Sequence, residues 1–490
     1  MPEVALAAVN EAAAEAGEQI ARAGGNAVDA TIAAALVAMV NEFGIVTLSS
    51  AGFMTIQPPG GNAPVTVDGG MEMPGRNREL GGGTWEIETG YGGGVTVTVG
   101  PGSVATHGSI AAMGLAHERW GVLPWTELFG PAIKVAREGF HLSAASRYYL
   151  SYVHNTVFGW DTAGHEVITA EDGEIMASEV VVPHLVDTLE HIARYGPAAM
   201  YTGDIGHAMA DDVIDRGGIM SREDLAAYRP VVRNSLIAKA GAWVLGTNPP
   251  PSVGGVCVAA MMRLLNGVPA AKWTAEDTEI LIAAQRAVLG HRLNVLNHSV
   301  DLESDVLQFL ELVDNGDLSF LESGSTAAIS AVDSDGLACA LTISSGYGSG
   351  MLAKGTGIWM NNTLGELELN PRGLHGLAPG ERLMSNMAPT VARNDAGSIL
   401  AISSPGADRI TTAIVQVLSG ALNGKMSLLD AINHRRVHVH NAGQPDEVVK
   451  VEEDLSMYYG GVVAALRHTD GHMEVGADPR RDGGTRMVRE

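Results

Sequence analysis

The most informative stretch of this chain is Leu-Glu-Ser-Gly-Ser-Thr-Ala-Ala-Ile-Ser-Ala-Val-Asp, residues 321–333. A polar Gly/Ser break runs directly into an apolar segment, which turns at 333–336 and returns as a second apolar run over 337–343. This pattern predicts a β-hairpin. Thr326 stands at the head of the hairpin, directly after a flexible Gly-Ser pair.

A threonine at this place is suited to a chain that cuts itself between Ser325 and Thr326. Thr326 would then be a new N-terminus, with a hydroxyl nucleophile and an α-amino base on one residue. An α-amino group has a pKa of about 7.7–8.0, so it can accept a proton near neutral pH. Before cleavage the nitrogen is an amide, and the precursor should be inactive. On these residues alone, a loop threonine before a strand is the simpler interpretation.

Short motifs in a fixed order along the chain favour the self-cleavage interpretation of Thr326. They are Gly24-Gly-Asn-Ala-Val-Asp-Ala30, Gly52-Phe-Met54, Gly100-Pro-Gly-Ser-Val104, Tyr201-Thr-Gly-Asp204, Pro250-Pro-Ser-Val-Gly-Gly255, Met387-Ala-Pro-Thr390, Ser404-Pro-Gly406 and Asp478-Pro-Arg480. In this order, and together with Thr326, they resemble the γ-glutamyltransferase family of N-terminal-nucleophile hydrolases. The resemblance covers nearly the whole chain.

The resemblance implies a four-layer αββα sandwich that is cut once. Fragments 1–325 and 326–490 would form one compact body, a heterodimer of a large and a small subunit. Periodicity alone gives only a mixed α/β chain. It predicts helices over 4–23 and 27–40, strands over 44–105, and mostly helices over 109–230, with Asn26 and Ser221 as N-caps. Another helix should start near Asp408.

Composition limits the partners of this chain. It has 490 residues, 46% hydrophobic and 18% charged, which is typical of a globular protein. A net charge of −25 argues against nucleic acid and anionic membranes. Cys257 and Cys339 lie in apolar contexts and are expected to be buried thiols. The first residues lack a signal-peptide pattern, and the apolar run 32–40 is too short to span a bilayer, so we expect a cytoplasmic protein.

The resemblance also implies which groups perform the chemistry. The backbone N–H groups of Gly406 and Ala407, between a strand and a helix N-terminus, would form the oxyanion hole. Relatives have a Gly-Gly pair here, and alanine keeps the N–H. Ser344 takes the place of a threonine whose hydroxyl binds the new α-amino group. Without the resemblance these would be an ordinary turn and a polar residue at a strand end.

The family's glutamate-binding residues are mostly replaced. Gly70 stands where an arginine would hold the substrate α-carboxylate. Glu366 matches the acidic residue that binds the substrate amine, but Thr363 replaces a glutamine, and Ser385-Asn386 replace a pair of serines. Losing a buried arginine–carboxylate fork typically costs several kcal/mol. The residues that could supply a replacement anion site are Arg76, Arg78, Arg382 and Arg409, each of which has a surface or structural role as its simpler interpretation.

No cofactor is expected. His438 and His440 share one face of a predicted strand and could form a metal pair, but the sequence shows no third ligand. The favoured function is therefore a self-processing threonine hydrolase or acyltransferase. It would cleave an amide, or a C–C bond next to an oxalyl-type group, in a small non-glutamyl carboxylate of a biosynthetic or catabolic pathway. The alternatives are a true γ-glutamyltransferase or glutathione hydrolase, and an inactive binding subunit.

Overall fold

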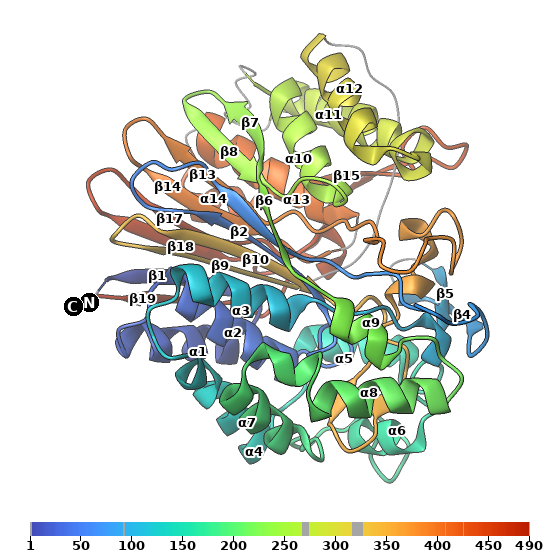
Figure 1. Ribbon diagram of the computed structural model, residues 1–490. Coiled ribbons are helices and arrows are strands. Elements are labelled where there is room, and N and C mark those ends of the chain that lie inside the picture. The colour runs from blue at the N-terminus through green and yellow to red at the C-terminus, as the bar shows by residue number, and fades with distance from the viewer. Residues whose placement is uncertain are drawn as a thin grey trace.

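The computed structural model describes residues 2–91, 94–266, 274–315, 327–406, 408–424 and 426–489. Two sheets stack face to face at its centre, and helices cover the outer face of each (Figure 1). The layers therefore run helix, sheet, sheet, helix. This is the αββα sandwich expected from the resemblance.

Both large sheets are antiparallel throughout. The first has the order β19 (Gly484–Val488), β1 (Val4–Ala8), β9 (Ala327–Asp333), β10 (Ala338–Ser344), β2 (Ala51–Gln57), β3 (Val65–Gly69) and β6 (Val231–Asn234). The second has the order β18 (Met473–Ala477), β17 (Val463–Arg467), β14 (Ile399–Ser403), β13 (Thr390–Asn394), β8 (Trp243–Thr247) and β7 (Leu236–Ala240). Each sheet contains strands from before residue 316 and from after residue 326. The two proposed fragments therefore share both sheets.

The predicted hairpin is present as β9 and β10 in the middle of the first sheet. Every residue of both strands is buried, because one face packs on helices and the other on the second sheet. The layer between the sheets is made largely of small apolar side chains, including Val332, Ala338, Ala340 and Ala401. Small residues let the two backbones approach closely, and this brings the ends of β10 and β14 together.

Helices on the first sheet's side are α1 (Glu11–Arg22), α2 (Ala27–Asn41), α3 (Ser109–Trp120), α4 (Gly130–Glu138), α5 (Ala144–Val153), α6 (Thr162–Ile168), α7 (Leu185–Tyr195), α8 (Asp204–Asp215) and α9 (Arg222–Ala227). Those on the other side are α10 (Val253–Leu264), α11 (Ala275–Asn294), α12 (Leu302–Asn315), α13 (Arg409–Leu418) and α14 (Leu428–Asn433). Both predicted N-caps are confirmed: Asn26 and Ser221 each form a capping box. Among the described residues, no helix combines the length and apolarity needed to cross a membrane.

One predicted element is wrong. Residues 4–8 are not the start of a helix but strand β1, which pairs with β9 and β19; the helix starts at Glu11, behind the N-cap Asn10. Three short hairpins complete the structure. They are β4 (Trp85–Thr89) with β5 (Val95–Val99), β11 (Leu352–Ala353) with β12 (Ile358–Trp359), and β15 (Val437–His440) with β16 (Val448–Val451).

Candidate active site

The predicted nucleophile and cleavage site, Thr326 and Ser325, lie outside the described residues, as does Ala407 of the predicted oxyanion hole. Their surroundings are described. Strand β9 begins at Ala327, which pairs with Ile343 of β10, and the next residue of β10, Ser344, pairs with Ala51 of β2. Ala327, the first described residue of β9, therefore lies next to the end of β10 at Ser344.

A narrow pocket opens next to Ser344. It brings together five of the predicted site residues, which are Ser344, Thr363, Glu366, Ser385 and Asn386. The apolar walls of the pocket were not among the predicted site residues. They are formed by Ala51, Phe53, Met71, Leu369, Leu383, Met384 and Met387. A signal was available for Phe53, because β2 is the hairpin's neighbour and its Gly-Phe-Met motif was noted. The pocket suits a small, largely apolar group with a few polar contacts.

Among the described residues that line this pocket, Glu366 is the one with an acidic side chain. It is 2% exposed, and its side chain lines the pocket. Burial, together with the negative charge of Glu368, raises the pKa of Glu366 well above its ordinary value. Gly346 lies against it, because a Cβ there would come within 2.8 Å of Glu366 Oε1. The buried carboxyl is therefore available to a hydrogen-bonding group of a ligand.

At Gly70, close to the pocket, the arginine of the family is absent and another arginine has a structural role. Arg382 Nη1 donates to the Gly70 carbonyl and to the Tyr228 hydroxyl, and its guanidinium stacks 4.5 Å from the Tyr228 ring centre. Nε of Arg382 lies 3.6 Å from Glu72 Oε1. The N–H groups of Arg382 thus already bind other groups of the protein. Arg382 is not a ready anion site.

Two other candidate arginines are also excluded from the pocket. Arg76 pairs with Glu72 at 3.3 Å and with Asp224 at 3.4 Å. Arg78 is exposed in a surface hollow beside α8 and α9. Neither lines the pocket at Ser344. Of the four candidates, this leaves Arg409, which does not line this pocket either but belongs to the turn that follows β14.

The predicted oxyanion turn follows β14. Ser403 ends that strand and ties the two sheets together, since its hydroxyl lies 3.1 Å from the Ile329 carbonyl oxygen of β9. Gly406 has φ +125°, and a Cβ there would come within 2.5 Å of Gly460 Cα. Only glycine fits this combination of backbone angle and space. Helix α13 starts at Arg409, so the turn leads into a helix N-terminus, which favours a developing negative charge.

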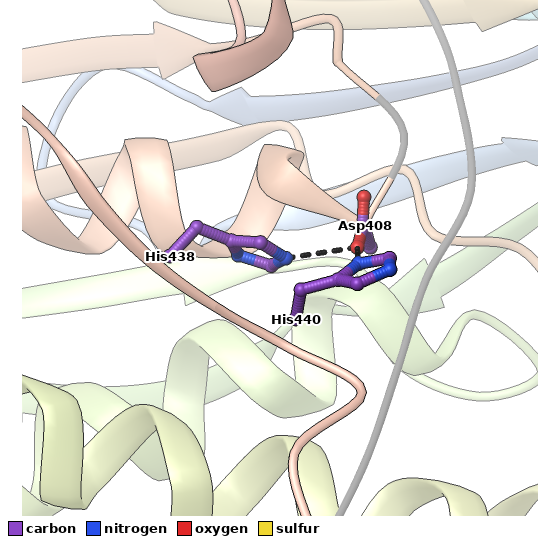
Figure 2. A group of neighbouring side chains, drawn as sticks. All are labelled: Asp408, His438 and His440. Atoms are coloured by element: carbon purple, nitrogen blue, oxygen red, sulfur yellow. Dashed lines mark hydrogen bonds and ion pairs between the residues drawn. The ribbon is translucent and has the colours of Figure 1, made fainter. Parts of the chain in front are cut away.

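Asp408, within this turn, lies between two histidines (Figure 2). His438 Nε2 donates to Asp408 Oδ2 at 2.9 Å, and His440 Nδ1 lies 3.7 Å from the same oxygen. Burial lowers the pKa of His438, which favours the neutral imidazole. Burial by itself raises the pKa of Asp408, but the charges of Arg409 and His438 and the hydrogen bonds from the two histidines together outweigh it and hold that pKa well below its usual range.

The histidine pair therefore has a third potential ligand, contrary to the sequence analysis. The ligand atoms of Asp408, His438 and His440 lie within 4.8 Å of one another. However, Arg409 Nη1 pairs with Oδ1 of Asp408 and already matches its charge. A divalent cation would leave a buried excess of positive charge, which is costly. We interpret the cluster as a support of the turn, with Asp408 tied to two histidines of β15.

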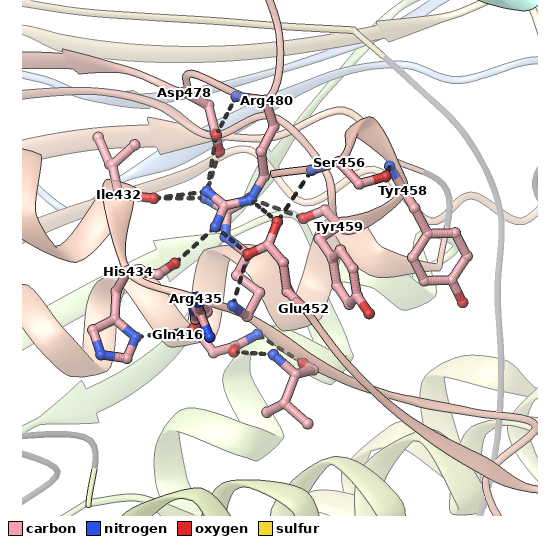
Figure 3. A network of polar contacts seen from close by, with 12 residues as sticks. Gln416, Ile432, His434, Arg435, Glu452, Ser456, Tyr458, Tyr459, Asp478 and Arg480 are labelled. Carbon is pink, nitrogen blue, oxygen red and sulfur yellow. Dashed lines mark hydrogen bonds and ion pairs between the residues drawn. The ribbon is translucent and has the colours of Figure 1, made fainter. Parts of the chain in front are cut away.

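A second polar network holds the segment that packs against the turn (Figure 3). Arg480 Nε donates to Glu452 Oε1 at 2.6 Å, and its Nη1 donates to Asp478 Oδ1 at 3.0 Å. Arg436 Nη1 donates to the Tyr459 carbonyl at 2.8 Å. These buried ion pairs fix residues 452–460, whose Gly460 touches Gly406. The Asp478-Pro-Arg480 motif thus supports the segment that packs against the predicted oxyanion turn.

Comparison with known proteins agrees with this geometry. Residues 13–488 match the family model described as gamma-glutamyltranspeptidase. The chain belongs to the gamma-glutamyltranspeptidase family. Within that family it is 26% identical over 488 residues to the glutathione hydrolase proenzyme of Escherichia coli (strain K12), covering 92% of this chain and 83% of that protein.

A second relative is named as an acylase rather than as a glutathione hydrolase. The acylase ACY 1 proenzyme of Pseudomonas sp. (strain V22) is 27% identical over 512 residues, covering 97% of this chain and 88% of that protein. The crystal structure of cephalosporin acylase from Bacillus halodurans superposes with a TM-score of 0.82 at 21% identity, covering 99% of this chain and 96% of that one. That structural likeness establishes the N-terminal-nucleophile hydrolase fold.

Proposed function

We propose that this member of the gamma-glutamyltranspeptidase family cuts itself before Thr326 and then uses Thr326 to cleave an acyl bond in a small, carboxylated, non-glutamyl substrate. The family membership supports an acyl-transfer enzyme. The proenzyme names of its relatives are consistent with processing into two fragments. The pocket beside Ser344 supports a small substrate.

In the proposed maturation, Thr326 Oγ attacks the Ser325 carbonyl carbon, and the acyl group moves from nitrogen to oxygen. Water then hydrolyses this ester, which leaves a carboxylate on Ser325 and a free α-amino group on Thr326. In turnover, that amine takes the hydroxyl proton while Oγ attacks the substrate carbonyl. The proton then goes to the leaving group, and water releases the acid from the threonine ester. Ser344 would hydrogen-bond the amine, and the N–H groups of Gly406 and Ala407 would bind the oxyanion.

The observation that carries the non-glutamyl proposal is the set of side chains that line the pocket. A γ-glutamyl group presents an ammonium and an α-carboxylate, and both need partners when buried. Glu366 is available for the ammonium, but Gly70 supplies no side chain and Arg382 is bonded to the Gly70 carbonyl. A γ-glutamyl substrate would therefore leave its carboxylate unpaired at this end. That favours a different acyl group, bound by Glu366 through an N–H or carbonyl.

Two experiments test the proposal. On a denaturing gel the purified protein should separate into fragments 1–325 and 326–490, and Edman sequencing of the smaller should read Thr-Ala-Ala-Ile. On the processed protein, γ-glutamyl-p-nitroanilide and glutathione should be turned over at least about 100-fold less efficiently than oxamate-like or other short acyl compounds. Ordinary transpeptidase efficiency would restore the glutathione hydrolase alternative. An uncut protein without activity would favour the inactive binding subunit.

A further inference from the structure

We propose that Arg409 binds a carboxylate of the substrate, at the opposite side of the catalytic centre from Glu366. The inference rests on the proposed function, because it names a binding residue of the same site. Arg409 is the first residue of α13, and its backbone N–H donates to the Gly406 carbonyl at 3.0 Å. The turn expected to bind the oxyanion therefore also carries this guanidinium.

The hydrogen bonds of Arg409 leave part of its guanidinium available. Nε donates to the Tyr458 carbonyl at 2.9 Å, Nη1 pairs with Asp408, and the Tyr458 ring lies 4.3 Å from the guanidinium carbon. Among the described residues, Nη2 has no acceptor, although the Arg409 side chain is only 10% exposed. A largely enclosed arginine stacked on a ring, with one nitrogen that no described protein group binds, suits a planar carboxylate.

The charges around Arg409 allow it to accept a second anion. Asp408 is held by His438 and His440 as well as by Arg409, so a substrate carboxylate at Nη2 need not break the existing ion pair. Lys450 lies 4.5 Å from the ring centre of Tyr458 and adds positive charge there. Because Asp408 already matches the charge of Arg409, Lys450 is the group that would balance the charge of a carboxylate at Nη2.

Tyrosines connect Arg409 with the Glu366 pocket. Tyr347 directly follows Gly346, which lies against Glu366, and the charge of Arg409 reaches the same tyrosine, since burial, Glu368 and Glu366 raise the pKa of Tyr347 while Arg409 lowers it. The Tyr91 ring contacts Tyr347 at 6.3 Å. The site would thus have a buried carboxyl at one end, a guanidinium at the other, and an aromatic wall between them. A short dicarboxylic acyl compound matches that order of groups.

The test uses processed protein and two p-nitroanilides of equal length, glutaryl and valeryl, which differ by a terminal carboxylate. In Arg409→Gln, kcat/KM for the glutaryl compound should fall about 10- to 100-fold, while that for the valeryl compound stays within about threefold. Arg409→Lys, which keeps the charge, should fall less. The matched control is Arg216→Gln, since Arg216 also pairs with aspartates and stacks on a ring but lies at the end of α8. It should leave both values unchanged.

A binding measurement separates this inference from the proposed function. Calorimetric titration of the processed protein with oxalate, malonate, succinate and glutarate should give at least one dissociation constant that rises about 10-fold or more in Arg409→Gln. If the protein binds these anions through Arg409 but cleaves no acyl compound, the proposed function fails and the inference stands. If both p-nitroanilides lose activity equally, or if no dicarboxylate binds in an Arg409-dependent way, the inference is overturned.

Discussion

Two arginines near the candidate active site differ in what surrounds them. Arg382 donates to the Gly70 carbonyl and the Tyr228 hydroxyl, and it lies close to Glu72, so it holds three segments of the protein together. Arg409 is equally enclosed but has no described acceptor on Nη2. Both side chains are 10% exposed. Burial alone therefore does not identify a binding arginine; the number of N–H groups left for a ligand does.

The largest expected effect concerns Thr326, the proposed nucleophile. Thr326→Ala removes the hydroxyl needed for both maturation and turnover, so the variant should stay uncut and inactive while both arginine environments remain folded. Thr326→Ser keeps a hydroxyl and should still be processed, more slowly. Gel electrophoresis and an acyl-p-nitroanilide assay check both variants. Cleavage and activity in the alanine variant would move the chemistry to another residue.

The next effect is on the turn that carries Arg409. Gly406→Ala should lower kcat about 100- to 1,000-fold, because the added Cβ meets Gly460 at 2.5 Å and displaces an oxyanion donor. Gly397→Ala is the matched control in the β13–β14 connection. Gly397 also has a positive φ, +99°, but open space around its Cβ position. It should cost about 1 kcal/mol of stability and no activity. Equal kinetic losses in both variants would contradict the role of the turn.

The free energy of unfolding of the two variants should distinguish the structural role of Arg382 from the proposed binding role of Arg409. Arg382→Gln removes the cation from the Gly70 carbonyl and one of the two cations from Glu72, which keeps Arg76, and we expect a loss of about 3 kcal/mol in the free energy of unfolding. Arg409→Gln should lose less, because Asp408 keeps His438 and His440. Thermal melting of the two processed variants provides the comparison. A larger loss for Arg409→Gln would make it the structural residue of the pair.

The smallest effect concerns Glu366, the other end of the proposed site. Its pKa is raised in the folded protein, so its contribution to stability is full below its ordinary pKa of 4.5 and is lost as pH rises through the raised value. Glu366→Gln replaces the ionisable carboxyl by a neutral amide, so this loss of stability with rising pH does not occur in the variant. Without substrate, the variant should be more stable than the unmodified protein at pH 8, and the difference should shrink toward pH 4.5.

Denaturation across this pH range, with Glu79→Gln as an exposed control, measures the effect of Glu366. Substrate turnover should nevertheless fall in Glu366→Gln, because the carboxyl is the proposed ligand of the acyl group. A variant that is less stable than the unmodified protein at pH 8 would mean that Glu366 has a partner in the folded state and is not held ready for a ligand.

Much of the fold could be predicted from local patterns. The hairpin of β9 and β10 and the capping boxes at Asn26 and Ser221 depend on turn and cap chemistry within a few residues. Residues 4–8 were misread as helix because Val-Ala-Leu-Ala-Ala has high helix propensity. Pairing with β9 and β19, distant in the chain, overrides that preference.

For the site, the sequence by itself determined the candidate residues: Thr326 as the proposed nucleophile, Ser344, the Gly406 turn, Glu366, and a glycine at 70 in place of an arginine. These residues lie within short motifs whose order along the chain is enough to recognise the family resemblance, and the resemblance implies their roles. Only the tertiary structure decided which arginine has donors left for a ligand and that Asp408 meets two histidines thirty residues or more away. Those properties depend on how distant segments fill each other's hydrogen bonds, which no local pattern encodes.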